Sequence, residues 1–203
     1  MERVIAYVDG FNLYFGLKSR GWRRYYWLNV HALCENLLLP TQQLVRTRYF
    51  TSRVSAPAGK VKRQATYLEA IQTVAKCETS FGHYLVNPRT CRRCGYVDQV
   101  PTEKMTDVNI ATELLTDAFQ NAFDTALLVS TDSDLTAPIS AMRRFFPAKR
   151  AVIGFPPGRF SVTLRNTAHA HLIIGRKKIA DSQFPNEVRK ADGFVLRRPA
   201  GWK

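Results

Sequence analysis

The chain has no apolar run long enough to cross a membrane. None of its 203 residues lies in a stretch approaching the roughly 20 consecutive apolar residues that a spanning helix needs. The first residues also lack the basic start and small-residue cleavage site of a secretory signal peptide. With 45% hydrophobic residues the composition is that of an ordinary globular protein with one core. These absences favour a cytoplasmic protein without a membrane partner.

Acidic residues are scarce, with 16 Asp and Glu against 30 Lys and Arg, so that the formal net charge is +14. Such an excess attracts polyanions. Basic residues alternate with aromatic ones in "KSRGWRRYYW" (residues 18–27), a mixture typical of nucleic-acid binding. Because no basic amphipathic helix is evident, nucleic acid is favoured over an acidic membrane surface. Solubility alone is the other explanation of the charge.

Glycine-rich phosphate-binding motifs are also missing. Neither G-x-G-x-x-G nor a Gly-Lys-Ser/Thr string follows a predicted strand, which argues against a dinucleotide or nucleoside triphosphate site. The first strand is not followed by the Asp-x-Asp of haloacid-dehalogenase-like phosphatases either, because Gly10 and Phe11 come after Asp9.

Short apolar runs alternate with helical patterns along the chain. The predicted strands are 4–8, 44–50, 126–130, 151–155 and 171–175, with 44–50 nearer an edge. The predicted helices are 61–77, 106–123 and 135–146. This alternation predicts an α/β fold, an open, mostly parallel sheet flanked by helices. One domain is expected over 1–175, with a Cys-containing insertion at about 77–105 and a basic C-terminal extension at 176–203.

Four aspartates occupy places where a purely solubilising role is unexpected. Asp9 ends the first apolar run, and Asp132 follows the run at 126–130. In open α/β sheets the ligand site lies beyond the carboxyl ends of the strands. Asp134 lies where the chain turns into the next helix, and Asp107 lies in the first turn of its helix on the inward face. Three segments are therefore expected to bring carboxylates to one edge of the sheet.

Carboxylates crowded together raise each other's pKa unless a cation neutralises them. Oxygen ligands without a nearby His select Mg²⁺ or Mn²⁺ over zinc. Such an ion orients and polarises a phosphate and generates hydroxide from water, which is the chemistry of phosphodiester hydrolysis. The positive charge of the chain agrees with that substrate.

Each aspartate also has a structural explanation. Asp134 or Ser133 is a suitable helix N-cap, and Asp107 complements its helix dipole. Asp9 and Asn12 have the spacing of an Asx turn. The coincidence of all of these at one presumed edge favours a functional site.

Three motifs occur in order, namely "VDGFNLY" (8–14), "TDVNIATELLTDAF" (106–119) and "LLVSTDSDL" (127–135). In these residues the chain resembles the NYN domain, the LabA-like branch of the PIN-like nuclease superfamily. The resemblance implies a PIN-like, Rossmann-like three-layer fold and a metal-dependent ribonuclease with one or two Mg²⁺ or Mn²⁺ ions. The site residues that it implies are Asp9, Asn12, Asp107, Asp132 and Asp134.

Cysteine is limited to four residues, and two of them form the C-x-x-C of "CRRCGY" (91–96). A tetrahedral zinc site is one hypothesis, with structural Zn²⁺ held by Cys77, His83, Cys91 and Cys94. The alternatives are a redox-active or surface thiol pair, Cys77 as a helix-packing residue, and zinc shared between two chains of a homodimer.

Basic residues in the aromatic-rich stretch, in the C-x-x-C turn and in the loop "GFPPGRFS" (154–161) are candidates for phosphate contacts. The candidates are Arg23, Arg24, Arg92, Arg93 and Arg159, together with Lys60, Lys62 and Arg63 around the start of the helix predicted over 61–77. Trp22, Tyr25, Tyr26 and Trp27 are candidates for stacking on unpaired bases, although the last two also suit a core.

Charge, carboxylates and resemblance together predict a Mg²⁺- or Mn²⁺-dependent endoribonuclease acting on single-stranded or structured RNA. The alternatives are a non-catalytic nucleic-acid-binding adaptor of the same fold and a regulatory protein-interaction module.

Overall fold

The structure, a computed structural model, describes residues 1–202, and the side chains of residues 84–87, 89 and 98–103 lie outside that description. Within the described residues a seven-stranded sheet has the order β4-β3-β2-β1-β5-β6-β7. Its strands are β1 (Glu2–Asp9), β2 (Gln42–Ser52), β3 (Cys77–Thr90), β4 (Val97–Lys104), β5 (Thr125–Val129), β6 (Arg150–Phe155) and β7 (Ala170–Ile173). All neighbouring pairs are parallel except β3 and β4. The predicted open, mostly parallel sheet is confirmed.

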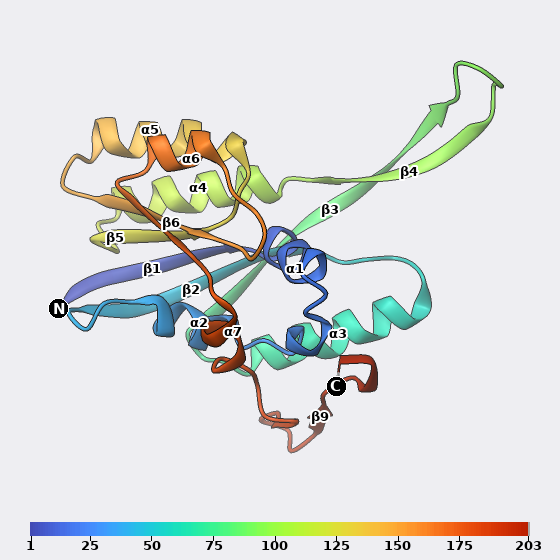
Figure 1. Cartoon of the computed structure of the whole chain (residues 1–203), viewed down its shortest axis with the longest axis horizontal. Helices are drawn as coiled ribbons and strands as arrows, with labels where there is room; N and C mark the ends of the chain where they lie inside the picture. Colours follow the sequence, from blue (N-terminus) through green and yellow to red (C-terminus); the bar gives the residue numbers. More distant parts are fainter. Residues whose placement is uncertain (203) are drawn as a thin grey trace.

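The helices form two layers, one on each face of the sheet (Figure 1). They are α1 (Gly10–Ser19), α2 (Val30–Leu37), α3 (Ala58–Gln72), α4 (Thr106–Phe119), α5 (Thr136–Phe145), α6 (Val162–Thr167) and α7 (Arg176–Ala180). Short 3-10 turns occur at η1 (Arg23–Tyr25), η2 (Ser133–Leu135) and η3 (Ala200–Trp202). None of the described helices is long and apolar enough to span a bilayer.

Strand β1 shows why the fold has three layers. It is apolar at successive positions, and its side chains alternate between the two faces. Val4, Ala6 and Val8 belong to one buried cluster, whereas Ile5 and Tyr7 belong to the other. A strand buried on both faces needs helices on both sides, which explains the continuous apolar run.

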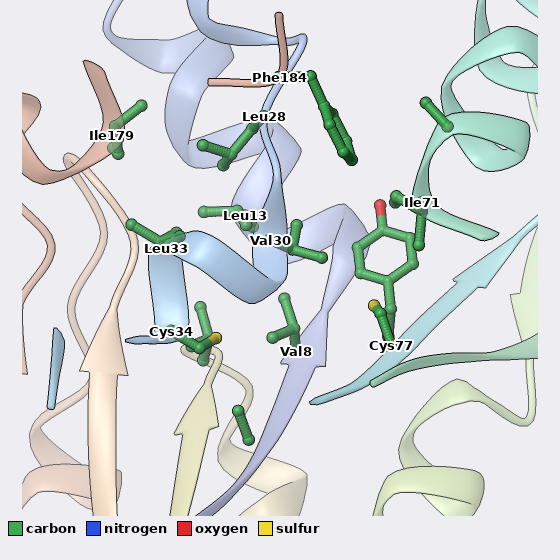
Figure 2. Close-up of a cluster of buried hydrophobic side chains, with 14 of the residues drawn as sticks. Val8, Leu13, Leu28, Val30, Leu33, Cys34, Ile71, Cys77, Ile179 and Phe184 are labelled. Carbon is green, nitrogen blue, oxygen red and sulfur yellow. The ribbon is translucent and has the colours of Figure 1, made fainter. Parts of the chain in front are cut away.

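The first cluster packs helices α1, α2, α3 and α7 against the sheet. Leu13, Leu33, Ile71 and Ile179 come from these four helices and are almost fully buried, as is Val8 below them (Figure 2). The second cluster packs α4, α5 and α6 on the opposite face. Both faces of the sheet are therefore covered by close-packed side chains, which hold the strand ends in place.

All three predicted helices are found, and each ends earlier in the chain than predicted. Helix α3 ends at Gln72, and Cys77 starts β3 instead of closing the helix. The strand expected near an edge, β2, is interior, because it pairs with both β1 and β3. Pro138 is in the first turn of α5, where its missing N–H costs nothing.

The segment expected as an insertion is an extended hairpin. β3 pairs with β2 as far as Gly82 and with β4 from His83 onward. Figure 1 shows the hairpin projecting from the body of the protein. The described part of the expected C-terminal extension packs onto the core through Ile179, Phe184 and Trp202. It also contains the small hairpin β8 (Glu187–Arg189) and β9 (Val195–Arg197).

Candidate active site

The candidate site lies at the carboxyl ends of β1 and β5. The two strands are parallel neighbours, with Val8 opposite Val129, so Asp9 and Ser130 leave the sheet side by side. Such an edge is where open α/β sheets bind ligands. Helix α1 starts directly after Asp9, and η2 starts directly after Asp132.

Asp9 is buried, with 4% of its surface exposed, and it caps α1. Its Oδ1 accepts a hydrogen bond from the backbone N–H of Asn12 at 2.9 Å. Its Oδ2 accepts from Asn12 Nδ2 at 2.7 Å and from Ser130 Oγ at 3.1 Å. Burial raises the pKa of Asp9, these hydrogen bonds lower it, and the nearby Asp132 charge raises it. Neutral donors thus hold a carboxylate that burial penalises.

Asn12 links this carboxylate to a loop on the other side of the site. Thr131 Oγ1 donates to Asn12 Oδ1 at 2.5 Å and accepts from Arg159 Nε at 3.2 Å. Arg159 belongs to the loop between β6 and α6. Two predicted site residues, Asn12 and Arg159, are therefore joined through Thr131.

Asp132 is half-buried and fixes the turn that follows β5. Its backbone N–H donates to Ser130 Oγ at 3.0 Å, and its Oδ1 accepts from the backbone N–H of Asp134 at 3.0 Å. The N-cap of this turn is thus Asp132, whereas Asp134 is exposed. The structural alternative of an N-cap at Asp134 is wrong for this reason.

Asp107 reaches the same edge from another direction. It lies half-buried in the first turn of α4, and α4 packs against both β1 and η2. Because α4 leads into β5, its amino end lies near the carboxyl ends of the strands. The helix dipole favours an acid at this position.

The predicted sharing of one ion by all four carboxylates is not seen. Among the described side chains, no three His, Cys, Asp or Glu residues converge so as to hold a metal ion. Asp9 and Asp132 interact electrostatically, but Asp132 is engaged as a cap and Asp134 faces solvent. Within the same described residues, none of Asp9, Asp132 and Asp134 forms an ion pair with a basic side chain.

The family model of the NYN domain matches residues 3–175, which is most of the chain. The chain belongs to the NYN domain family. Both strand ends that carry Asp9 and Asp132 lie inside the matched region.

This NYN domain is similar to one curated protein in sequence and to one solved structure in fold. It is 28% identical over 189 residues to 6-hydroxy-3-succinoylpyridine 3-monooxygenase HspA of Pseudomonas putida (strain DSM 28022 / S16), a match covering 74% of this chain and 59% of that protein. This chain thus spans less than two thirds of that relative. A solved structure of a protein of unknown function from Vibrio parahaemolyticus has a TM-score of 0.57 and 18% identity, covering 86% of this chain and 94% of that chain. That similarity concerns the fold alone.

The predicted four-residue zinc set does not form in this NYN domain. Cys77 is buried at the start of β3, whereas Cys91 and Cys94 are exposed at the far end of the hairpin. A strand of 14 residues separates them by about 40 Å. His83 pairs with Lys104 part-way along. Cys91 and Cys94 alone offer two thiols, half of the ligands of a tetrahedral zinc site.

Cys77 has the structural role that was the alternative. It belongs to the buried cluster around Val8 and Ile71 (Figure 2). Burial raises the pKa of its thiol to about 12. A thiol of this kind is unreactive at neutral pH.

The predicted phosphate-binding arginines of the NYN domain are not gathered in one place. Arg159 lies at the acidic edge. Arg92 and Arg93 are exposed at the hairpin turn, and Arg23 and Arg24 are exposed in η1. Of the aromatic candidates, Trp27 is fully buried and belongs to the core, whereas Trp22, Tyr25 and Tyr26 are half-buried.

Sequence reasoning missed Ser130 and Thr131. Both hydroxyls bridge predicted site residues, Ser130 between Asp9 and the backbone of Asp132, and Thr131 between Asn12 and Arg159. The available signal was a pair of hydroxyl residues between the end of an apolar strand and an acid. Such residues at a strand end supply hydrogen bonds to whatever the edge carries.

Proposed function

We propose that this NYN domain is a Mg²⁺- or Mn²⁺-dependent endoribonuclease. The observation that carries the proposal is the pair of carboxylates, Asp9 and Asp132, at the shared end of β1 and β5. In the described part of the chain neither has a basic partner, although the whole sequence carries a net charge of +14. A buried carboxylate without a cation costs stability, which a bound divalent ion would offset.

The residues present fit such an ion. Carboxylate oxygens of Asp9 and Asp132 are hard ligands, and the hydroxyl of Ser130 lies between the two segments. Mg²⁺ is commonly bound through one or two carboxylates and keeps several waters, so three converging acids are not required. When bound, the ion would polarise a phosphoryl oxygen and lower the pKa of a water molecule.

The protein's own side chains then have separate tasks. Asn12 fixes the orientation of Asp9 through two hydrogen bonds. To Arg159, held through Nε by Thr131, we assign the binding of a phosphate oxygen of the RNA backbone. To Asp107 and Asp134, at the rim of the same edge, we assign orientation of the attacking water.

The test is RNA cleavage by the wild type, Asp9→Asn and Asp132→Asn with Mn²⁺, Mg²⁺ or EDTA. Asp181→Asn is the matched control, because it removes one negative charge from the exposed pair with Lys177 on α7. Loss of cleavage with EDTA and in both site variants, at least about 100-fold, supports the proposal, since even residues that only orient metal ligands cost 10- to 100-fold. Cleavage that persists in EDTA and in Asp132→Asn contradicts it.

The other functions are distinguished by the same experiment. RNA binding without cleavage in any metal indicates a non-catalytic adaptor. Neither binding nor cleavage indicates a protein-interaction module.

A second candidate function is chemistry on a small aromatic compound. Two observations favour it. One is the relative named as a monooxygenase of 6-hydroxy-3-succinoylpyridine, and the other is a cavity of about 670 Å³ that is lined by aromatic side chains and by Gly10, the residue after Asp9. Consumption of that pyridine by the purified chain, with dioxygen and a reduced nicotinamide or flavin, tests it by chromatography.

A further inference from the structure

A cavity of about 670 Å³ adjoins the candidate site. It lies on the α1 and α3 side of the sheet and is lined by residues of α1, α3, β2 and the C-terminal turn η3. Gly10, the residue after Asp9, forms part of its wall. This volume is sufficient for one nucleotide-sized ligand.

The wall next to Asp9 is closely fitted. A Cβ on Gly10 would lie 2.5 Å from the hydroxyl oxygen of Tyr49 and 2.8 Å from the carbonyl oxygen of Phe50. Only glycine lets Tyr49, a residue of the cavity wall, approach α1 this closely. The Asp9 charge also raises the pKa of Tyr49, after the larger effect of burial. The cavity and the acidic edge therefore share a wall.

Aromatic rings form much of the cavity lining. Ring centroids are 5.0 Å apart for Tyr14 and Tyr26, 5.7 Å for Tyr26 and Trp202, and 5.9 Å for Trp202 and Tyr67. The hydroxyl of Tyr67 donates to the Leu28 carbonyl at 2.9 Å, which fixes that ring. Such a wall favours a planar ring as ligand, because stacking on aromatic side chains tolerates any base.

The cations around the cavity have no acidic partner. Lys18, Arg23, Lys60 and Arg63 line it, and no Asp or Glu is found among the residues of its lining. In the part of the chain that the structure describes, none of these four forms an ion pair. Four uncompensated positive charges around one cavity favour an anionic ligand.

We infer that this cavity binds a planar aromatic ring carrying an anionic group, and that its occupant is one unpaired nucleotide of the RNA substrate. The base lies against Tyr26 and Trp202, and the phosphate is bound by Arg63 and its basic neighbours. This assignment rests on the proposed ribonuclease function, because the cavity begins one residue from Asp9. Tyr26 is among the residues for which the sequence predicts base stacking, whereas Trp202 is not.

The test is a binding titration on the full chain without metal, in which protein NMR or calorimetry measures binding. The probes are a nucleoside monophosphate, its nucleoside, inorganic phosphate and, as the small aromatic anion, benzoate or nicotinate. The monophosphate is expected to bind best. Arg63→Gln should weaken it about 10-fold, equal to about 1.4 kcal/mol, and leave the nucleoside unchanged.

Controls separate the cavity from the rest of the surface. Lys177→Gln removes an exposed charge on α7 outside the cavity lining and should leave binding unchanged. Trp202→Phe keeps an aromatic ring at a largely buried position, so it tests stacking in a folded protein. It should weaken nucleoside and nucleotide alike.

The outcomes distinguish this inference from the proposed function. Nucleotide binding at the cavity without any RNA cleavage by the wild type would contradict the nuclease while the cavity assignment as a nucleotide site stands. Metal-dependent cleavage with a KM that Arg63→Gln does not change, and no nucleotide binding, would overturn the cavity assignment. Tighter binding of benzoate or nicotinate than of any nucleotide would overturn RNA as the occupant.

Discussion

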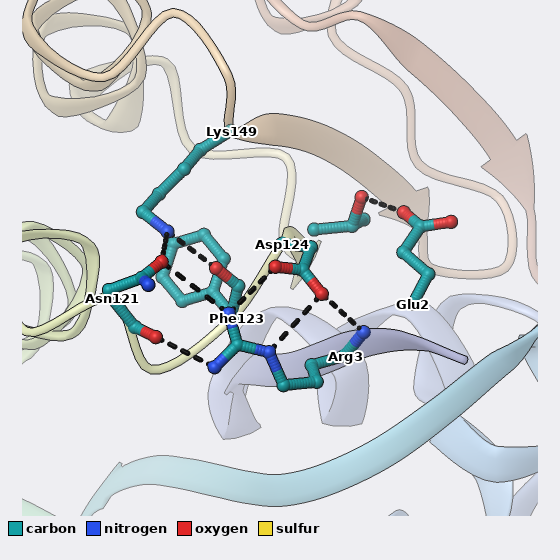
Figure 3. A network of polar contacts seen from close by, with 7 residues as sticks. Glu2, Arg3, Asn121, Phe123, Asp124 and Lys149 are labelled. Carbon is teal, nitrogen blue, oxygen red and sulfur yellow. Dashed lines mark hydrogen bonds and ion pairs between the residues drawn. The ribbon is translucent and has the colours of Figure 1, made fainter.

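The carboxylates at the two ends of strand β1 have different partners. At the amino end, Arg3 binds Asp124 through Nη2 at 2.7 Å and through its backbone N–H at 2.8 Å (Figure 3). Lys149 lies alongside and donates to the Asn121 side chain at 2.8 Å and to the Phe123 carbonyl at 2.6 Å. At the carboxyl end, Asp9 is bound by an amide and a hydroxyl instead.

Burial alone does not explain this difference. Asp117 is even more buried than Asp9, with 1% of its surface exposed, yet Arg48 donates to both of its oxygens at 2.8 Å. Tyr7 donates to the same carboxylate at 2.7 Å. The comparison teaches that the partner, rather than the depth, separates the carboxylate paired with a cation within the fold from the one to which we assign a divalent ion.

The largest expected effect on stability comes from removing the cation that pairs with the buried Asp117. Arg48→Met leaves Asp117 buried without its cation, so the free energy of unfolding should fall by about 3–5 kcal/mol in urea denaturation. Arg46→Met is the control, because Arg46 pairs with Glu78 on the surface and should cost less than about 1 kcal/mol. Equal losses in the two variants would contradict the distinction between the buried and the exposed pair.

Asp9→Asn should instead lower RNA cleavage strongly and stability little. RNA cleavage is expected to fall at least about 100-fold, while the free energy of unfolding changes by less than about 1 kcal/mol, because relief from burying a charge offsets the weakened hydrogen bonds from Asn12 and Ser130. Cleavage and urea unfolding are measured on the same preparation. A loss of stability as large as that of Arg48→Met would show that Asp9 is structural.

Sequence patterns predicted the strand ends because apolar runs followed by Asp9 and Asp132 are local features. They did not predict the Arg48–Asp117 pair, whose members are 69 residues apart and meet only through the pairing of β2 with β1 and the packing of α4. The helical pattern of 61–77 extended to Cys77 because apolar spacing continues past the true helix end at Gln72. Tertiary pairing with β2 takes over there.

The same limit applies to the site. Local motifs selected Asp9, Asn12 and Asp132 as candidates, and the structure joins the first two by hydrogen bonds. The cavity was not predicted, because its wall combines Tyr49, Tyr67 and Trp202 from three distant segments. The four residues of the zinc hypothesis are not brought together, because Cys77 and Cys91 lie at opposite ends of the long strand β3, whose length follows from its pairing with β2 and β4.

Divalent ions should stabilise the folded protein through the carboxyl end of β1 and β5, and not through the amino end of β1. At about ten times its dissociation constant, Mn²⁺ should raise the free energy of unfolding by about 1.4 kcal/mol, since it binds only the folded state. The shift should vanish in Asp132→Asn and persist in Arg3→Gln. Thermal denaturation with and without EDTA measures it, and an equal shift in Asp132→Asn would place the ion elsewhere.

The smallest effect is the pH dependence, and its sign differs between the ends. Hydrogen bonds from Arg3 lower the pKa of Asp124 from 3.8 to about 2, so its contribution is present above pH 4 and is lost as the pH falls toward 2. Burial raises the pKa of Asp9, so the folded state retains a proton that the unfolded chain releases, and stability falls as pH rises above 4.

Arg3→Gln should therefore flatten the acid limb of the stability profile, by less than about 1 kcal/mol because the pair is exposed. Asp9→Asn should instead flatten the decline above pH 4 in unfolding measured without metal. Identical profiles for both variants would mean that the two ends of β1 do not differ in the way their carboxylates are held.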